Sequence, residues 1–418
     1  MEIKRDDYLN KLINRENNGL IKVITGLRRS GKSYLLFNLY YNYLISKGID
    51  KSHIIDIALD DRTNKELRNP DNMLKFIKEK ITDDKLYYIL LDEIQYLDEF
   101  EDVLNSLMHI RNADVYVTGS NSKFLSSDVI TEFRGRGDEI HVFPLSFREF
   151  ISVYQGTIDE AWDDYYNYGG MPLVLSRETS KEKTEYLKSL FEKVYISDIL
   201  ERHKKIKNKI ELDELLDILS SAVGSLTNPL KLSKTFRSEK NKNIDDKTIK
   251  RYIDYFEDSF LINEAKRYDV KGKKYINSPY KYYFEDIGLR NARINFRQTE
   301  ENHVMENIIY NELRIRGYNV DVGVVNVYEK NEKGSRILKS YEVDFVVTQG
   351  NNKYYIQSAF SMSNPEKIRQ ENNSLINIGD SFKKIIVVKD NIKPRRDENG
   401  VVTMGIFNFL TDANSLDV

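Results

Sequence analysis

The residues with the clearest chemistry are Gly26 to Ser33, GLRRSGKS, which match the phosphate-loop pattern G-x-x-x-x-G-K-[ST] at every fixed position. Glycines at both ends allow positive φ, so successive backbone N–H groups can point at phosphate oxygens. Lys32 is expected to reach the β- and γ-phosphates, and the Ser33 hydroxyl to bind Mg²⁺. The expected nucleotide contacts are Gly26, Leu27, Arg28, Arg29, Ser30, Gly31, Lys32, Ser33 and Tyr34.

A pair of acids, Asp92 and Glu93, follows the unbroken apolar run Leu86–Leu91. In the Walker B pattern, the first acid helps to hold Mg²⁺ and the second orients or deprotonates the attacking water. Such pairs also cap helices, but a position 60 residues after Lys32 favours the catalytic interpretation. We therefore expect Asp92 to be a metal ligand and Glu93 to be catalytic.

Two further segments carry weaker signals. Asn121, in the polar cluster after the strand Val115–Thr118, is expected to sense the γ-phosphate or the attacking water, with Ser120 as the alternative. An ordinary turn with a serine helix cap explains the cluster equally well. Arg134 and Arg136 are candidates for stabilising charge in the transition state, in their own or a neighbouring subunit, although a solvated surface pair is the alternative.

These residues need a scaffold of alternating strands and helices. Short apolar runs predict strands, and amphipathic stretches between them predict helices. This order predicts an α/β fold, a three-layer P-loop NTPase core (residues 1–145) whose parallel sheet carries the ligand loops at the carboxyl ends of its strands. The predicted strands are Leu20–Thr25, His53–Leu59, Leu86–Leu91, Val115–Thr118 and Glu139–Phe143.

Three regions are predicted after the core: a helical lid (146–208), a winged-helix-like domain (209–290) and an α/β restriction-endonuclease-like domain (291–418). From Lys231 to Lys274 the chain has 13 Lys or Arg against 8 Asp or Glu, a net charge of +5. A basic helix with a basic wing is one footprint of DNA binding, and winged helices equally serve as protein contacts. The candidate phosphate contacts are Lys247, Lys250, Arg251, Lys271, Lys273 and Lys274.

The last region carries the outline of a PD-(D/E)xK nuclease site, with Glu306 on a predicted helix and Asp344 in an E-V-D strand. Its third motif reads Gln357-Ser358-Ala359, so Gln replaces a metal-binding carboxylate and Ala359 replaces the lysine. Cleavage of nucleic acid is therefore not expected, and a chance likeness of strands is the alternative.

Composition limits the other classes of function. Among 418 residues, 64 are basic and 66 acidic, so there is no global signal for binding polyanions. The absence of Cys excludes disulfides, thiolate metal sites and cysteine nucleophiles. No apolar run approaches the ~20 residues that span a bilayer, and the amino end lacks the apolar core of a secretion signal. We therefore expect a soluble, cytoplasmic protein.

The chain resembles the AAA+-type P-loop ATPases of bacteria and archaea that carry a C-terminal domain of uncharacterised function. The similarity runs over nearly the whole length, in the motifs GLRRSGKS, LLDEIQ, TGSNS, FRGR…PLSFREF, YGGMP, KYYFEDIGLRNA, ENIIYNELRIRGY and EVDFV…YYIQ. The resemblance implies an ATP-binding core, a lid, a winged-helix-like region and a degenerate nuclease-like tail. It assigns the phosphate and Mg²⁺ contacts to Lys32 and Ser33, and the Walker B acids to Asp92 and Glu93.

We expect an ATP-hydrolysing switch or remodeller that acts on DNA or on a DNA-bound partner. ATP is favoured over GTP because the chain has no N-K-x-D motif to recognise guanine. The alternative is a signalling or scaffold protein that hydrolyses nucleotide slowly and does not bind DNA. The protein partner and the oligomeric state do not follow from the sequence.

Overall fold

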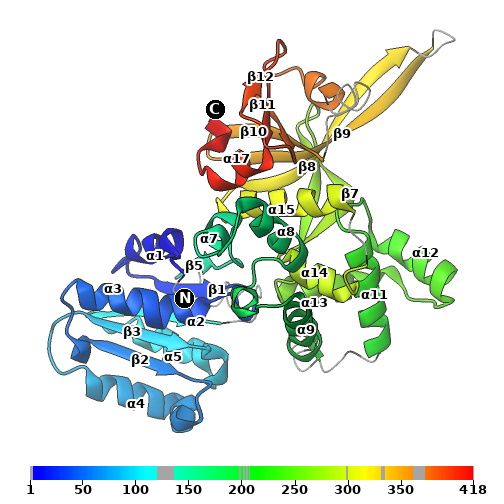
Figure 1. Ribbon diagram of the computed structural model, residues 1–418. Helices are drawn as coiled ribbons and strands as arrows, with labels where there is room; N and C mark the ends of the chain where they lie inside the picture. Colours follow the sequence, from blue (N-terminus) through cyan, green and yellow to red (C-terminus); the bar gives the residue numbers. More distant parts are fainter. Residues whose placement is uncertain are drawn as a thin grey trace. The chain divides into compact units, whose positions relative to one another are not determined.

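The computed structural model describes residues 3–119, 136–196, 199–200, 203, 206, 208–297, 300–330, 335–360 and 372–417 (Figure 1). Ser120, Asn121 and Arg134, for which the sequence predicts roles, lie outside the described residues. The chain forms two compact units. The first comprises Met1–Leu145, Met171–Leu173 and Asp258–Leu261; the second comprises Ser146–Gly170, Val174–Glu257 and Ile262–Val418.

The first unit is built on a five-stranded parallel sheet, which confirms the predicted α/β class of the core. The strand order is β2-β3-β4-β1-β5, so β1 has β4 on one side and β5 on the other. Loops at the carboxyl end of such a strand lie where the strand order reverses, which is the usual ligand position in open α/β sheets. The strands are β1 Ile21–Thr25, β2 Ile54–Ala58, β3 Tyr87–Asp92, β4 Ala113–Thr118 and β5 Gly137–His141.

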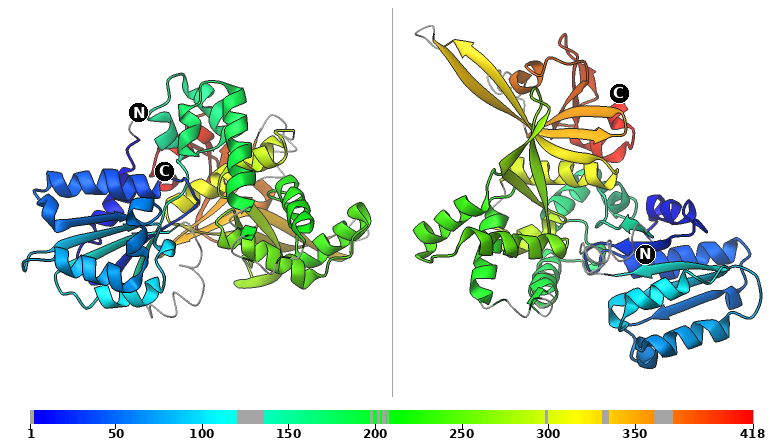
Figure 2. Two further views of the ribbon diagram at one scale, coloured as in Figure 1. Left: turned by 90° about the horizontal axis from the view of Figure 1, so that it is seen from below. Right: turned by 180° about the vertical axis from the view of Figure 1, so that it is seen from behind.

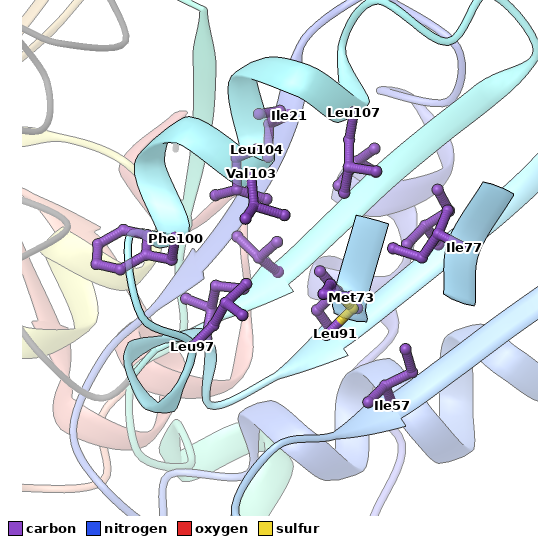
Figure 3. Close-up of a cluster of buried hydrophobic side chains, with 14 of the residues drawn as sticks. Ile21, Ile57, Met73, Ile77, Leu91, Leu97, Phe100, Val103, Leu104 and Leu107 are labelled. Carbon is purple, nitrogen blue, oxygen red and sulfur yellow. The ribbon is translucent and has the colours of Figure 1, made fainter. Parts of the chain in front are cut away.

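Helices cover both faces of this sheet (Figure 2), because alternate strand residues are apolar on each face. Figure 3 shows the side on which Met73 and Ile77 of α4 and Leu104 of α5 pack against the strands. On the other side Leu36, Tyr40 and neighbouring side chains form a second core. The helical segments are α1 Asp6–Ile13, α2 Lys32–Tyr34, η1 Leu35–Tyr40, α3 Tyr41–Ser46, η2 Lys51–His53, η3 Arg62–Arg68, α4 Pro70–Lys80, η4 Ile94–Tyr96 and α5 Phe100–Leu107.

Helices of the second unit begin at well-formed caps. Ser146, Thr157 and Thr179 each form a capping box with the glutamate three residues later, which satisfies two orphan donors per helix. The helical segments are α7 Phe147–Ile151, α8 Ile158–Tyr168, η6 Pro172–Ser176, α9 Ser180–Leu190, η7 Phe191–Ile196, α11 Lys209–Ser221, α12 Pro229–Lys240, α13 Asp246–Asp258, α14 Ile287–Arg293, α15 Glu301–Ile315, α17 Ile406–Thr411 and η8 Ser415–Asp417.

An eight-stranded mixed sheet completes the second unit, in the order β12-β13-β11-β10-β9-β8-β6-β7. The hairpin β6–β7, which the sequence predicts as a wing, pairs through β6 with β8, so this sheet crosses the boundary predicted at residue 290. The four-part division of the chain therefore differs from its two units of contact. The strands are β6 Ile262–Asp269, β7 Lys274–Phe284, β8 Asn319–Lys330, β9 Arg336–Gln349, β10 Asn352–Ala359, β11 Lys383–Val388, β12 Arg395–Arg396 and β13 Val401–Gly405.

Two motifs that lie far apart in sequence, YGGMP and KYYFEDIGLRNA, interlock in the second unit. The buried carboxylate of Asp286 accepts hydrogen bonds from the backbone N–H groups of Gly170 (2.7 Å) and Leu289 (2.9 Å). A Cβ at Gly288 would lie 2.0 Å from the carbonyl oxygen of Tyr168, so only glycine fits this approach. These contacts fix the carboxyl end of α8 against the start of α14.

Candidate functional site

The predicted phosphate loop lies at the carboxyl end of β1 and leads directly into the helical segment that begins at Lys32. Gly26 and Gly31 have φ of +130° and +103°, in the region that favours glycine. A Cβ at Gly26 would lie 2.2 Å from the carbonyl oxygen of Val142, so this position cannot hold a larger residue without a shift of the backbone. The loop geometry therefore explains both fixed glycines of the pattern.

Lys32 is buried within the loop that precedes it. Its ammonium group donates hydrogen bonds to the carbonyl oxygens of Gly26 (3.0 Å) and Leu27 (2.9 Å). These contacts hold the ammonium inside the loop, where the predicted phosphates would bind. The positive start of the helix adds to the attraction for an anion.

The Ser33 hydroxyl lies close enough to the Asp92 carboxylate to lower its pKa, so the two predicted Mg²⁺ ligands meet in space. Asp92 is buried at the end of β3, the strand two places from β1, with β4 between them. Burial raises the pKa of Asp92, and hydrogen bonds from Thr118 and Ser33 oppose this rise. A hydroxyl and a carboxylate oxygen are hard donors that suit Mg²⁺, so the pair fits the expected metal.

Thr118, the last residue of β4, connects the two predicted Walker B acids, Asp92 and Glu93. Its hydroxyl donates to the Asp92 carboxylate and accepts a hydrogen bond from the backbone N–H of Glu93 (3.0 Å). A sensor is predicted further along the chain, at Asn121, and no motif in the sequence points to Thr118. Its only signal in the sequence is its position at the end of a strand beside the Walker B strand.

Glu93 is half-buried and has a φ of +51°, an uncommon value for a residue other than glycine. Its carboxylate accepts a hydrogen bond from the side-chain amide of Gln95. This turn directs the chain away from β3 directly after Asp92. The Gln95 contact restricts the rotamer of the Glu93 side chain, as a group that must orient a water molecule requires.

Arg5 is a second residue that motif reasoning misses. Its guanidinium is buried and donates to the carbonyl oxygens of Ser30 in the phosphate loop and Phe143 after β5, both at 2.9 Å. The ring of Tyr8 lies 4.5 Å from the guanidinium carbon. The segment before β1 therefore braces the phosphate loop, and no motif in that segment predicts this contact.

Arg136 lies at the amino end of β5, since its carbonyl oxygen accepts from Ile21 N–H at the start of β1. The two strands are parallel, with Gly137 beside Ile21 and His141 beside Thr25, so the phosphate loop follows the opposite end of β1. Four residue steps along a strand cover about 13 Å. This placement does not support Arg136 as a finger within its own chain, and a role in a neighbouring subunit stays a prediction.

The predicted nucleic-acid surface is only partly available. The Lys250 ammonium lies 2.7 Å from Asp254 and 3.7 Å from both Glu257 and Glu264, so three carboxylates neutralise it. Lys250 is therefore not available as a phosphate contact. The other candidate phosphate contacts, Lys247 and Arg251 of α13 and Lys271, Lys273 and Lys274 at the β6–β7 turn, are exposed.

Comparison with known proteins agrees with the geometry of the first unit. The family described as an AAA domain matches residues 18–151, and a domain of unknown function, DUF8612, matches residues 159–300. The match to a Walker-type ATPase of Pyrococcus abyssi has a TM-score of 0.49 and 15% sequence identity, and it covers 70% of this chain and 96% of that chain. The first unit therefore contains an AAA-like domain, which supports the class of AAA-type ATPases.

Two relatives are similar over most of their length. An uncharacterized protein of Haemophilus influenzae is 34% identical over 392 residues, which are 92% of this chain and 93% of the relative. The uncharacterized protein MJ1544 of Methanocaldococcus jannaschii is 28% identical over 366 residues, 84% of this chain and 77% of the relative. The chain belongs to the family of the Haemophilus influenzae protein. In the part of the chain that the structure describes, no helix is long and apolar enough to cross a membrane.

Proposed function

We propose that the protein binds and hydrolyses ATP with Mg²⁺ at the site formed by the phosphate loop, Asp92 and Glu93. The observation that carries this proposal is the proximity of the Ser33 hydroxyl to the Asp92 carboxylate, which lowers the pKa of Asp92. It joins a helix start and a strand end that are 60 residues apart in sequence, at the switch point of a parallel sheet. The match of residues 18–151 to an AAA domain supports the same class.

Each group has a distinct task in this proposal. Lys32 exchanges its bonds to loop carbonyls for the β- and γ-phosphate oxygens. Ser33 and Asp92 hold Mg²⁺, which neutralises charge on the phosphates. Glu93 orients the attacking water and accepts its proton, while Thr118 keeps Asp92 and the Glu93 backbone in register. Arg5 holds the loop in a shape that can surround a phosphate.

The test separates nucleotide binding from turnover. Lys32→Ala should abolish tight ATP binding, measured with a fluorescent ATP analogue, because it removes the charge on the phosphates. Glu93→Gln should bind ATP as the wild type does yet hydrolyse it about 100-fold more slowly or worse, since only the water-orienting carboxylate is lost. Wild-type turnover by Glu93→Gln would contradict the assignment of the base, and ATP binding by Lys32→Ala would contradict the site.

A second candidate function is contact with duplex DNA, and one observation favours it. Lys271, Lys273 and Lys274 are all exposed on one turn, which directly follows the strand β6 that pairs with β8. In this proposal ATP turnover controls the contact with DNA or with a DNA-bound partner. If the protein binds no duplex at low salt, a slowly hydrolysing signalling or scaffold role takes its place.

A further inference from the structure

A buried lysine in the second unit lies among three acidic side chains, Glu306, Glu342 and Asp344. Lys281 belongs to β7, and its side chain is only 3% exposed. Its ammonium nitrogen is 2.7 Å from Glu306 Oε1 on α15, 2.8 Å from Glu342 Oε1 and 3.6 Å from Asp344 Oδ1, both on β9. Two elements therefore bring three carboxylates to a cation on a third element.

Other donors complete the cluster. The Tyr283 hydroxyl donates to Glu306 Oε1 (2.5 Å), and the Ser358 N–H donates to Asp344 Oδ2 (2.8 Å). His303 Nδ1 lies 3.6 Å from Glu306 Oε2. Gln357, which replaces the third acid of the nuclease-like layout, accepts a weak hydrogen bond from Asp344 N–H through its side-chain oxygen (3.3 Å). The side-chain oxygen of Gln357 therefore faces the backbone of β9, and Lys281 is the group that pairs with the three carboxylates.

The charge state of Lys281 follows from its surroundings. Burial alone lowers the pKa of Lys281, but the facing carboxylates, Glu306 first, reverse this effect and hold it above its ordinary value. The lysine is therefore an ammonium ion at neutral pH. A buried cation that lost these partners would be costly, as would the carboxylates without the cation.

We propose that Lys281 is a built-in cation that takes the place of a divalent metal among Glu306, Glu342 and Asp344, and closes this cluster to metal ions. An ammonium in direct contact with two of the carboxylates leaves no room for a second cation, because Mg²⁺ binds oxygen at about 2.1 Å and would come within about 3 Å of the nitrogen. The alternative is that Lys281 is the lysine of a working nuclease site. In that case, the acids should still bind metal while Lys281 is present.

The proposal predicts a gain of metal binding when the cation is removed. In Lys281→Met the carboxylates lose their counter-charge, so the second unit should become less stable and should recover stability when Mn²⁺ binds. Trp162, the single tryptophan, is buried in α8 of the same unit and reports its unfolding by fluorescence. The experiment uses nucleotide-free, full-length protein with millimolar Mn²⁺, followed by thermal unfolding and by the electron paramagnetic resonance signal of free Mn²⁺.

We expect Mn²⁺ to raise the melting temperature of Lys281→Met by about 5 °C. It should leave the wild type, Lys281→Arg and Lys281→Met/Asp344→Asn unchanged. Comparison of Lys281→Met with Lys281→Met/Asp344→Asn separates Mn²⁺ bound at this cluster from any Mn²⁺ bound at Asp92. A folded Lys281→Met that takes up no Mn²⁺ beyond the double variant overturns the proposal.

A second comparison keeps the proposal falsifiable if Lys281→Met does not fold. Wild type and Asp344→Asn should leave equal concentrations of free Mn²⁺ in the resonance measurement, because the wild-type cluster binds none. Mn²⁺ binding by the wild type that Asp344→Asn abolishes would overturn the proposal and favour the nuclease alternative. Lys281→Met/Glu342→Gln loses one negative charge together with the cation, so it should be less destabilised than Lys281→Met. It should still bind more Mn²⁺ than the wild type.

Discussion

Thr118 shows how one hydroxyl can link binding to chemistry at the residue scale. It holds Asp92 through the carboxylate and Glu93 through the backbone, so it couples the proposed metal ligand to the proposed base. Neither acid can shift without breaking a contact with this fully buried side chain. Groups that orient metal ligands in this way commonly contribute 10- to 100-fold to affinity or activity.

We therefore predict that Thr118→Val lowers the ATPase kcat by about 10- to 100-fold. Valine has the same shape but cannot bond to Asp92 or to the Glu93 N–H. Steady-state ATP hydrolysis at saturating Mg²⁺ and ATP measures the effect, and binding of an ATP analogue checks that the loop is intact. Thr118→Ser retains the hydroxyl and should keep most of the activity; equal losses in the two variants would show that packing, not the hydrogen bonds, matters.

At the scale of elements, the joint between α8 and α14 depends on one buried carboxylate. Burial raises the pKa of Asp286 from 3.8 to about 6, although backbone N–H groups of Leu289 and Gly170 oppose the rise. The folded pKa therefore lies above the unfolded one. The stability that Asp286 contributes is fully present below about pH 4 and is lost as the pH rises through 6.

Asp286→Asn should therefore destabilise the second unit less at high pH than at low pH. The amide cannot accept as many N–H bonds, which costs about 1–3 kcal/mol. The difference in the free energy of unfolding between the wild type and the variant should shrink by about 1 kcal/mol between pH 5 and pH 7.5. The reason is that ionisation of the buried group destabilises only the wild type, since the amide does not ionise. Urea unfolding followed by Trp162 fluorescence measures the difference. Asp159→Asn, at an exposed position in the first turn of α8, is the control and should show no such trend.

At the scale of the whole molecule, charge is balanced overall but unevenly placed. The chain has 64 basic and 66 acidic residues, yet Lys271, Lys273 and Lys274 gather on one exposed turn. Lys250, by contrast, lies among three carboxylates and cannot add to that turn. A surface that binds phosphates must therefore be sought at the β6–β7 turn and not along the whole of α13.

We predict that Lys271→Glu/Lys273→Glu/Lys274→Glu weakens duplex binding and reduces the log–log salt slope by up to about 2.7, or 0.9 for each lost phosphate contact. Fluorescence anisotropy with a labelled duplex at several salt concentrations measures both quantities. Lys75→Glu/Lys78→Glu/Lys80→Glu makes the same change of charge on exposed positions of α4 and should have little effect. If the two triple variants weaken binding equally, only net charge matters and the turn is not a binding surface.

The sequence by itself predicted the core sheet and the side chains that gather at the carboxyl ends of its strands. Unbroken apolar strands, such as Tyr87–Leu91, are buried on both faces whatever surrounds them, and the glycines of GLRRSGKS meet local backbone requirements. Lys32, Ser33 and Asp92 could be predicted because each lies next to the end or start of such an element. The strand predicted at Glu139–Phe143 begins and ends two residues later than β5, because the pairing with β1 sets where β5 begins.

Only the tertiary structure decided which distant groups meet. Arg5 braces a loop 25 residues away, Lys281 reaches acids on α15 and β9, and Lys250 is neutralised by acids of its own helix and of β6. From the sequence, Lys250 is a candidate phosphate contact, and no motif singles out Arg5 or Lys281, since periodicity reports which face of an element is buried and not what lies opposite it. Long-range pairing of charges depends on how the strands and helices are ordered in space, and that order is a property of the whole fold.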